Sequence, residues 1–314
     1  MKELKRTYRR SGRILAAALL AVLILASFVD LPVSKLLYPG HESSLGQFFA
    51  AFGELPAFLC LSSAGVLLAW NRRRLPGVRP LYWLLGGAAL VLLGLALAVH
   101  EAVDNVPAMP VWTALLVAVF TAAVSGFGLI LLTANCPVKT VLRFVLTLVF
   151  VSLGTMVIVN LVKLPWGRAR MRLIVETGNE TYFTPWWKAG GALKKTLVAQ
   201  GVSSDEFRSF PSGHAACAAC SMLAILLPTL NRRWKGRERV CLLAAVGWTL
   251  VVAVTRIWMG AHFLSDVTVS WLIALGMCAL GIRLFYFDRK AFGAVWSFLN
   301  RRSAAPQDDA EADG

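Results

Sequence analysis

Three short segments of the chain carry residue types that can bind and cleave a phosphate ester. They are Lys163-x6-Arg170, Phe210-Pro211-Ser212-Gly213-His214, and Thr255-Arg256-x5-His262-x3-Asp266, and each lies at the edge of a long apolar run. Together they supply lysine, arginine, histidine, serine and aspartate side chains. Such a set can bind a phosphate group, attack its phosphorus and protonate the leaving oxygen without a metal.

The candidate phosphate-binding residues are of two kinds. Arg170 and Arg256 can donate paired N–H groups to phosphate oxygens, and Lys163 can add a point charge, although a lysine at a helix end often only snorkels towards water. Ser212 and Gly213 open an apolar segment, so their backbone N–H groups can face an anion at a helix N-terminus. Ser212 alone would be read as an ordinary N-cap.

The candidate catalytic residues are His262, Asp266 and His214. His262 and Asp266 are four residues apart, which predicts that they share one helix face. Asp266 can then accept a hydrogen bond from one ring nitrogen and leave the other free to attack phosphorus. His214 is the candidate acid that protonates the leaving oxygen and then the base that activates water. A lone histidine is usually structural, yet two of the four histidines in the chain lie in these motifs.

The composition indicates a membrane protein. Of 314 residues, 57% are hydrophobic and 16% are charged, and the mean hydropathy is +0.65. A soluble domain of this size needs more polar surface. The net charge of +15 could indicate nucleic-acid binding, but the basic residues form short clusters between apolar runs, as in cytoplasmic loops. Cys217 and Cys220 could suggest a metal or redox pair, but with no second pair they read better as small buried helix residues.

The predicted fold class is all-α, a polytopic helical membrane protein with about eight transmembrane helices. The first run follows a basic N-terminus and is read as a retained span or signal anchor rather than a cleaved signal peptide. Most runs reach the roughly 20 residues needed to cross a bilayer. The apolar segments cover about 14–37, 47–70, 80–100, 111–134, 143–164, 212–230, 240–256 and 263–286.

Basic clusters alternate with loops that are poor in Lys and Arg, which places both termini in the cytoplasm and all three motifs on the outer side. The loop at 165–211 is a basic exception, which long loops tolerate. Binding of an anionic substrate would explain its charge, and Trp186 and Trp187 would lie near lipid headgroups or, less readily, stack on a ligand. The residues of this loop expected to shape selectivity are Arg168, Arg172, Trp186, Trp187, Lys188 and Arg208.

The three motifs resemble the signature of the type 2 phosphatidic acid phosphatase (PAP2) superfamily, which runs K-x6-R-P, P-S-G-H and S-R-x5-H-x3-D. The resemblance covers roughly residues 140–285, with Met171 in place of proline and Thr255 in place of serine. It implies that His262 is the nucleophile that forms a phosphohistidine, with Asp266 orienting it and His214 as acid and base. It also implies a set of residues that hold the phosphate, namely Lys163, Arg170, Ser212, Gly213 and Arg256.

From these observations we expect N-terminal transmembrane helices at 1–109, a PAP2-like core at 110–287, and an interfacial helix with a disordered acidic tail at 288–314. The role of the first three helices is open. The loss of proline at Met171 is expected to alter the loop after Arg170 and substrate preference more than activity.

The expected function is a lipid phosphatase of a bacterial inner membrane that needs no metal or cofactor. Its substrate would be undecaprenyl pyrophosphate, phosphatidylglycerophosphate, phosphatidic acid or a lipid A phosphate. The alternatives are a lipid phosphotransferase that uses the same intermediate and a non-enzymatic lipid transporter. The sequence disfavours a soluble vanadium haloperoxidase and a nucleic-acid partner, because the chain is embedded and its basic residues are divided between two membrane faces.

Overall fold

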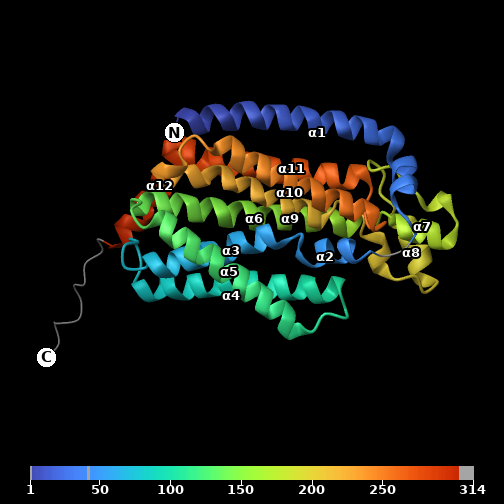
Figure 1. Cartoon of the computed structure of the whole chain (residues 1–314), viewed down its shortest axis with the longest axis horizontal. Helices are drawn as coiled ribbons and strands as arrows, with labels where there is room; N and C mark the ends of the chain where they lie inside the picture. Colours follow the sequence, from blue (N-terminus) through green and yellow to red (C-terminus); the bar gives the residue numbers. More distant parts are fainter. Residues whose placement is uncertain (1, 41–42, 304–314) are drawn as a thin grey trace.

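The computed structural model describes residues 2–40 and 43–303, and every regular element within these ranges is a helix. The long helices run alongside one another in a bundle (Figure 1). Seven segments are long and apolar enough to cross a membrane. The predicted all-α polytopic fold is therefore confirmed. The long helices are α1 (Lys2–Leu37), α3 (Leu55–Asn71), α4 (Pro80–Asn105), α5 (Val111–Thr133), α6 (Val138–Trp166), α10 (Glu238–Trp258) and α11 (Leu264–Ile282).

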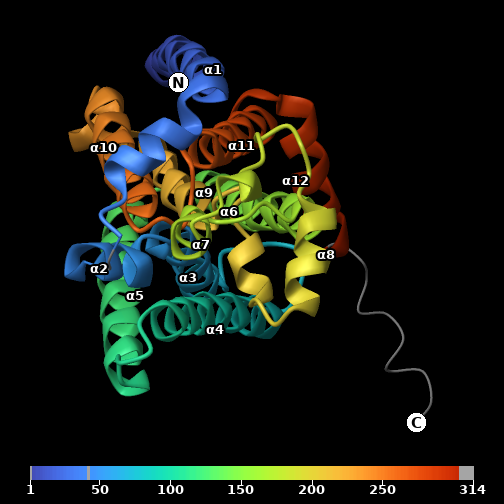
Figure 2. The same cartoon turned by 90° about the vertical axis from the view of Figure 1, so that its right-hand side faces the viewer.

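The predicted sixth span is shorter and lies in the middle of the bundle (Figure 2). It consists of α9 (Gly213–Ala219) followed by a 3-10 helix, η3 (Cys220–Thr229). α9 packs against α3, α6, α10 and α11. Its alanines are buried, and their small side chains let four helices approach it closely. Cys217 and Cys220 are free and buried in this segment, as expected for small helix residues.

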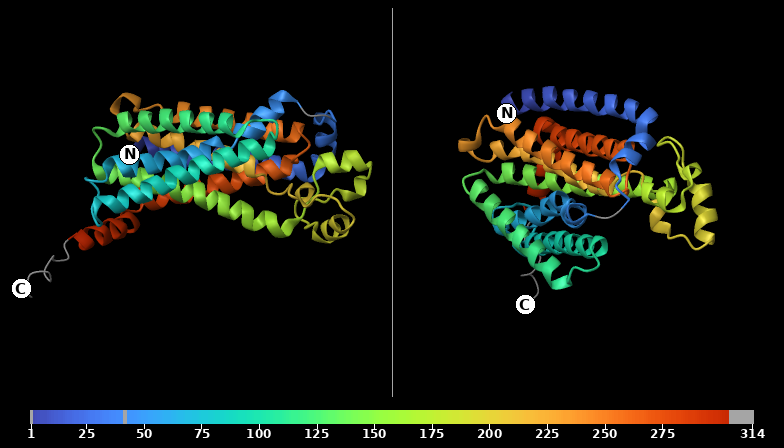
Figure 3. Two further views of the ribbon diagram at one scale, coloured as in Figure 1. Left: turned by 90° about the horizontal axis from the view of Figure 1, so that it is seen from below. Right: turned by 45° about the vertical axis from the view of Figure 1, so that its right-hand side comes forward.

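The long loop after α6 forms a compact cap at one end of the bundle. It contains α7 (Met171–Thr177), η1 (Glu180–Tyr182), α8 (Gly191–Ala199) and η2 (Ser204–Phe207). The N-terminus of α1 and α12 (Arg289–Ser303) lie at the opposite end (Figures 1 and 3). The remaining short helices are η4 (Arg232–Trp234) and η5 (Arg283–Phe287). The two ends of the bundle thus differ in structure as well as in sequence.

The second predicted span is divided into two helices. α2 (Ser44–Phe52) ends before Gly53, and α3 begins at Leu55, with Glu54 at its N-cap position. Pro56 lies in the first turn of α3, where a missing N–H costs nothing, so the helix starts naturally at this point. Glu54, at the break, is buried in the interior although the run around it is otherwise apolar.

α1 has two distinct faces. Ile24, Phe28 and Leu36 are large apolar side chains with exposed fractions of 66%, 80% and 85%, as expected of a lipid-facing surface. Asp30 and Ser34 are buried, and α1 packs along α11. A buried acid on a membrane helix is costly unless it has a partner. Asp30 therefore marks the face of α1 that joins the bundle.

The segment predicted to form an interfacial helix near the C-terminus is helical, as α12. It packs back on α6, where Arg143 lies 4.4 Å from the ring centroid of Phe292 and Lys139 lies 4.7 Å from that of Trp296. The acidic tail that we expect to be disordered lies, from residue 304 onwards, outside the described residues.

Candidate active site

A cavity of about 450 Å³ opens among α3, α4, α6, α9 and α10, beside the loop cap. It brings together most of the residues that the three motifs identify. Ser212 and Asp266 do not line it, because both are completely buried behind its wall. The predicted site residues that line the cavity are Lys163, Arg170, Gly213, His214, Arg256 and His262.

One side of the cavity is basic. Lys163 lies in the last turn of α6, and Arg256 lies in the last turn of α10 with only 5% of its surface exposed. Arg170 donates a hydrogen bond of 2.5 Å from Nη1 to Asp205. The Nε atoms of Arg170 and Arg256 are buried, and no acceptor within the described part of the chain bonds to them. Buried N–H donors without acceptors are costly, and a bound anion would satisfy them.

His262 lies in the turn between α10 and α11, at the wall of the cavity. The turn contains Gly260 at φ +62°, a backbone conformation that favours glycine. The Nδ1 atom of His262 lies 2.5 Å from the carbonyl oxygen of Ser209. A carbonyl can only accept, so Nδ1 carries the proton and Nε2 keeps its lone pair. This arrangement leaves Nε2 as the ring nitrogen that is available to act as a nucleophile.

Asp266 contacts His262 in a different way from the one that the spacing predicts. Because α11 begins at Leu264, His262 is not on the helix, and the predicted shared helix face is wrong. The Oδ2 atom of Asp266 is 3.9 Å from Nδ1 of His262, too far for a hydrogen bond. It accepts instead from the backbone N–H of Phe263 at 2.7 Å and from the Ser209 hydroxyl at 2.6 Å. Asp266 therefore holds the His262 segment in place through Ser209 and the helix cap.

Burial lowers the pKa of His262 well below its usual value, and the nearby positive charges of Lys163, Arg256 and Arg170 act in the same direction, with a smaller contribution from His214. Both causes penalise the imidazolium form. The ring is therefore neutral near pH 7, which is the form that can attack phosphorus.

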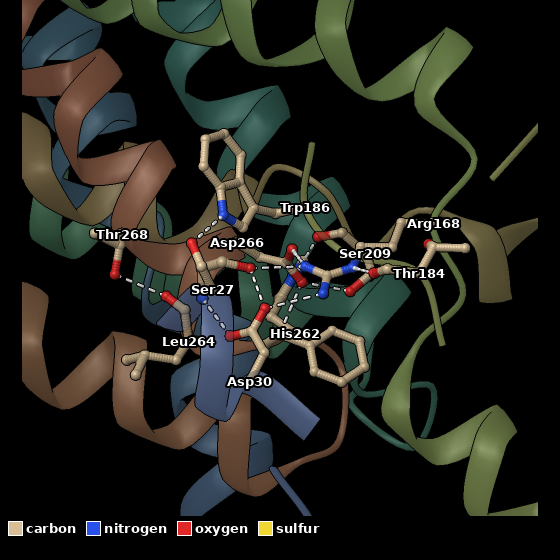
Figure 4. Close-up of polar contacts among 12 residues, drawn as sticks. Ser27, Asp30, Arg168, Thr184, Trp186, Ser209, His262, Leu264, Asp266 and Thr268 are labelled. Carbon is tan, nitrogen blue, oxygen red and sulfur yellow. Dashed lines mark hydrogen bonds and ion pairs between the residues drawn. The ribbon is translucent and has the colours of Figure 1, made fainter. Parts of the chain in front are cut away.

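Arg168 is the centre of a buried polar network behind the cavity (Figure 4). Its Nη2 donates to Asp30 at 2.9 Å, and its Nη1 donates to Asp266 and to the Ser265 hydroxyl. Its Nε donates to the carbonyl oxygen of Thr184 at 2.8 Å. We expect Arg168 from its place in the loop to shape selectivity, but it is completely buried and does not line the cavity. It links α1 to the Asp266 carboxylate instead.

Asp30 also caps α11 directly, because the backbone N–H of Ser265 donates to its Oδ1 at 2.8 Å. Sequence reasoning missed this residue. An acidic residue near the end of the first apolar run was a signal for it, since such residues usually have a buried partner.

His214 is surrounded by oxygen atoms. Its Nδ1 lies 3.0 Å from Oε1 of Glu54. Its Nε2 lies 2.8 Å from the carbonyl oxygen of Ala50 and 3.5 Å from Oε1 of Glu101. Neither acid was identified from the motifs, although a glutamate inside the apolar run 47–70 was a signal for the first.

Glu54, Glu101 and His214 are also the residues that could hold a metal ion in the described structure, with ligand atoms within 4.8 Å of one another. Lys163 and Arg256 disfavour a metal there, because they act electrostatically on the same carboxylates and would repel a divalent cation.

The two departures from the PAP2 signature are accommodated locally. Met171 is the first residue of α7, and Arg170 before it is extended (φ −78°, ψ 153°). Proline favours an extended residue before it and fits the first position of a helix, so methionine retains the backbone that proline would impose. Met171 is buried against Ile174 and Phe263. The hydroxyl of Thr255 donates to the carbonyl of Val252 at 2.8 Å within α10.

Other residues of the loop have structural partners. The Ser212 hydroxyl accepts from the N–H of Ala215 at 3.3 Å, which is ordinary N-capping. Trp186 donates from Nε1 to the Ser27 hydroxyl at 3.1 Å, whereas Trp187 is 55% exposed. Arg172 donates to both carboxylate oxygens of Glu206. Arg172 and Arg208 line the cavity, but Trp186, Trp187 and Lys188 do not.

Comparison with known proteins gives one family and one relative. The PAP2 superfamily model matches residues 144–290. Phosphatidylglycerophosphatase B of Bacillus subtilis (strain 168) is 36% identical over 92 residues, which cover 26% of this chain and 40% of the relative. The chain thus matches less than half of that relative's length. No solved structure gives a significant match. The matched region contains the three motifs and the helices that carry them, and over these residues the chain is similar to the PAP2 superfamily.

Proposed function

We propose that this protein is a membrane phosphatase that hydrolyses a lipid phosphate ester through a phosphohistidine on His262. One observation carries the proposal. The free Nε2 of His262 lies in the same cavity as two buried arginine Nε donors that lack a partner in the described structure. A nucleophile beside N–H donors that can bind an anion is the arrangement that phosphoryl transfer requires.

The reaction follows in two steps. Arg170, Arg256 and Lys163 bind the phosphate oxygens, Nε2 of His262 attacks phosphorus, and the bond from phosphorus to the lipid oxygen breaks. His214 gives its proton to that oxygen. Water then attacks the phosphohistidine, His214 takes a proton from the water, and inorganic phosphate leaves His262 free. Each role is compatible with the side chain's place in the cavity.

The substrate is proposed to be a phospholipid or a polyprenyl pyrophosphate. The helices around the cavity expose large apolar side chains, as a surface in contact with acyl chains does. The relative's name identifies it as a phosphatidylglycerophosphatase, which makes phosphatidylglycerophosphate the first candidate. Undecaprenyl pyrophosphate, phosphatidic acid and lipid A phosphates follow.

The cavity is proposed to face the exterior of a bacterial inner membrane. The basic N-terminal segment and α12 lie at one end of the bundle, and the loop cap beside the cavity lies at the other (Figure 1). Basic segments remain in the cytoplasm, so the cavity end faces outwards and both termini lie inside. Labelling of single cysteines placed in the cap by a membrane-impermeant reagent on intact cells would test this orientation.

The test of the activity is phosphate release in detergent from these four lipids, with excess chelator present. We expect wild type to release phosphate and His262→Ala to lose activity by several orders of magnitude. His100→Ala is the matched control, because His100 lines the same cavity and has no role in the mechanism. A 32P-labelled lipid should also give an acid-labile phosphoprotein that His262→Ala lacks.

Each outcome separates the alternatives. Transfer of phosphate to a lipid acceptor without release of free phosphate would make the protein a phosphotransferase. Equal activity of wild type and His262→Ala, or no turnover of any lipid with a folded preparation, would overturn the proposal.

A further inference from the structure

We infer that Glu54 and Glu101 are positioning residues that orient the His214 ring and stabilise its imidazolium form during catalysis. The inference rests on the proposed phosphatase function. It extends the site to two helices, α3 and α4, that precede the segment matched by the PAP2 model.

The contacts around the imidazole place an oxygen atom beside each ring nitrogen. Nδ1 lies 3.0 Å from Oε1 of Glu54, and Nε2 lies 2.8 Å from the carbonyl oxygen of Ala50. A neutral imidazole can donate from Nε2 to the carbonyl and turn its Nδ1 lone pair towards a protonated Glu54. Once Nδ1 is protonated, an ionised Glu54 faces its positive charge and stabilises it.

The charges near the ring explain why carboxylates are needed. Burial opposes protonation of His214 most strongly, and the positive charges of Arg256, Lys163 and Arg170 act in the same direction. These three cations cannot be removed, because they bind the phosphate. Glu54 and Glu101, when ionised, offset them from beside the ring. Oε1 of Glu54 is 3.0 Å from Nδ1, and Oε1 of Glu101 is 3.5 Å from Nε2.

The surroundings of both acids show that they are held in place. Glu54 is 8% exposed at the N-cap position of α3, and the Cys217 thiol contacts it from α9. Glu101 accepts a hydrogen bond of 2.8 Å from the side chain of Asn105, one turn later in α4. Neither carboxylate is within ion-pair distance of a lysine or arginine in the described structure, so their nearest charged partner is the His214 ring.

The proton accounting is simple. When the bond from phosphorus to the lipid oxygen breaks, the proton on Nε2 of His214 moves to that oxygen, which replaces the Ala50 carbonyl as the acceptor. The Glu54 carboxylate stays beside Nδ1. In the second step Nε2 takes a proton from the attacking water, and the two carboxylates stabilise the imidazolium that forms. The relation resembles that of the aspartate to the histidine in a serine protease triad.

The first test compares leaving groups. Glu54→Gln keeps the shape of the side chain but removes its charge, and Glu176→Gln, an exposed glutamate on α7, is the control. Loss of acid assistance harms poor leaving groups most. We expect Glu54→Gln to reduce kcat about 100-fold with an alkyl phosphate lipid and less than about 10-fold with p-nitrophenyl phosphate. In a His214→Ala background, Glu54→Gln should have little further effect.

The second test does not depend on activity. With 15N-labelled histidine, the His214 ring resonances are assigned by their loss in His214→Ala. We expect Glu54→Gln and Glu101→Gln to lower the pH at which the His214 ring loses its second proton, relative to wild type. Titration of the ring at the same pH in wild type and both variants would overturn the inference. If the variants instead showed this shift but wild type released no phosphate from any substrate, only the proposed function would fail.

Discussion

The charges in the buried network around Arg168 predict which substitutions destabilise the protein and which restore stability. Arg168 is completely buried between Asp30 and Asp266, and it bonds to both. The network therefore contains one positive and two negative groups. Arg168→Met removes the cation and leaves two carboxylates facing each other in an interior that solvates them poorly. Removal of one partner from a buried ion pair costs about 3–5 kcal/mol.

Asp30→Asn should be much milder. The amide oxygen can still accept the N–H of Ser265, and Arg168 keeps its pair with Asp266. The hydrogen bonds that Oδ2 accepts from Arg168 and from the Ser265 hydroxyl are lost, and the charged one is worth roughly 1.5–3 kcal/mol. The informative variant is the double substitution. In the Arg168→Met background, Asp30→Asn removes one of the two unpaired carboxylates, so it should raise stability rather than lower it.

Thermal unfolding of the purified protein in detergent measures these effects. We expect Arg168→Met to lower the unfolding midpoint by roughly 6–15 °C. The double variant should recover part of that loss, whereas independent effects would add. Arg233→Met provides a matched control, because Arg233 is exposed at the opposite end of the bundle. A double variant less stable than Arg168→Met alone would refute the account of the network as a charge triad.

Three further predictions concern the cavity. Because burial and neighbouring cations lower the pKa of His262, its neutral form persists as the solution is acidified, so the acid limb of kcat/KM should lie below pH 6.5; a midpoint above that value would contradict the assignment. Arg256→Lys should retain charge but lose the Nε donor, and we expect its kcat/KM to fall about 10-fold or more, with Arg256→Met falling further, in phosphate-release assays. Exhaustive dialysis against chelator should leave the phosphate-release rate unchanged within about twofold, since the cations that line the cavity are protein side chains, whereas restoration of a lost rate by added Mg²⁺ would contradict this.

The sequence predicted the helical bundle and the gathering of most motif residues, because both depend on local signals. Apolar runs of span length are visible without any knowledge of tertiary contacts. Lys163, His214 and Arg256 each lie at the end of such a run, and the alternation of basic loops places those ends at one face. The grouping of residues in the cavity therefore followed from topology alone.

What the sequence did not predict depends on contacts between helices that are distant along the chain. Asp30 and Arg168 are 138 positions apart, and Ala50 and His214 are 164 apart. The prediction that His262 and Asp266 share a helix face was wrong for another reason. Their spacing is equally compatible with one helix face and with a turn that leads into a capped helix, and only the position of the α11 N-terminus distinguishes the two.

The first helices contact the proposed site, although the sequence left their role open. The predicted boundary at residue 109 separates N-terminal helices from a PAP2-like core, but the polar groups behind the cavity come from both sides of it. Asp30 of α1 caps α11 and pairs with Arg168, while Glu54 and Glu101 contact His214. A buried carboxylate is costly unless its partner is in place. The N-terminal helices are therefore energetically tied to the proposed catalytic residues, and we expect substitutions in either part to affect the other.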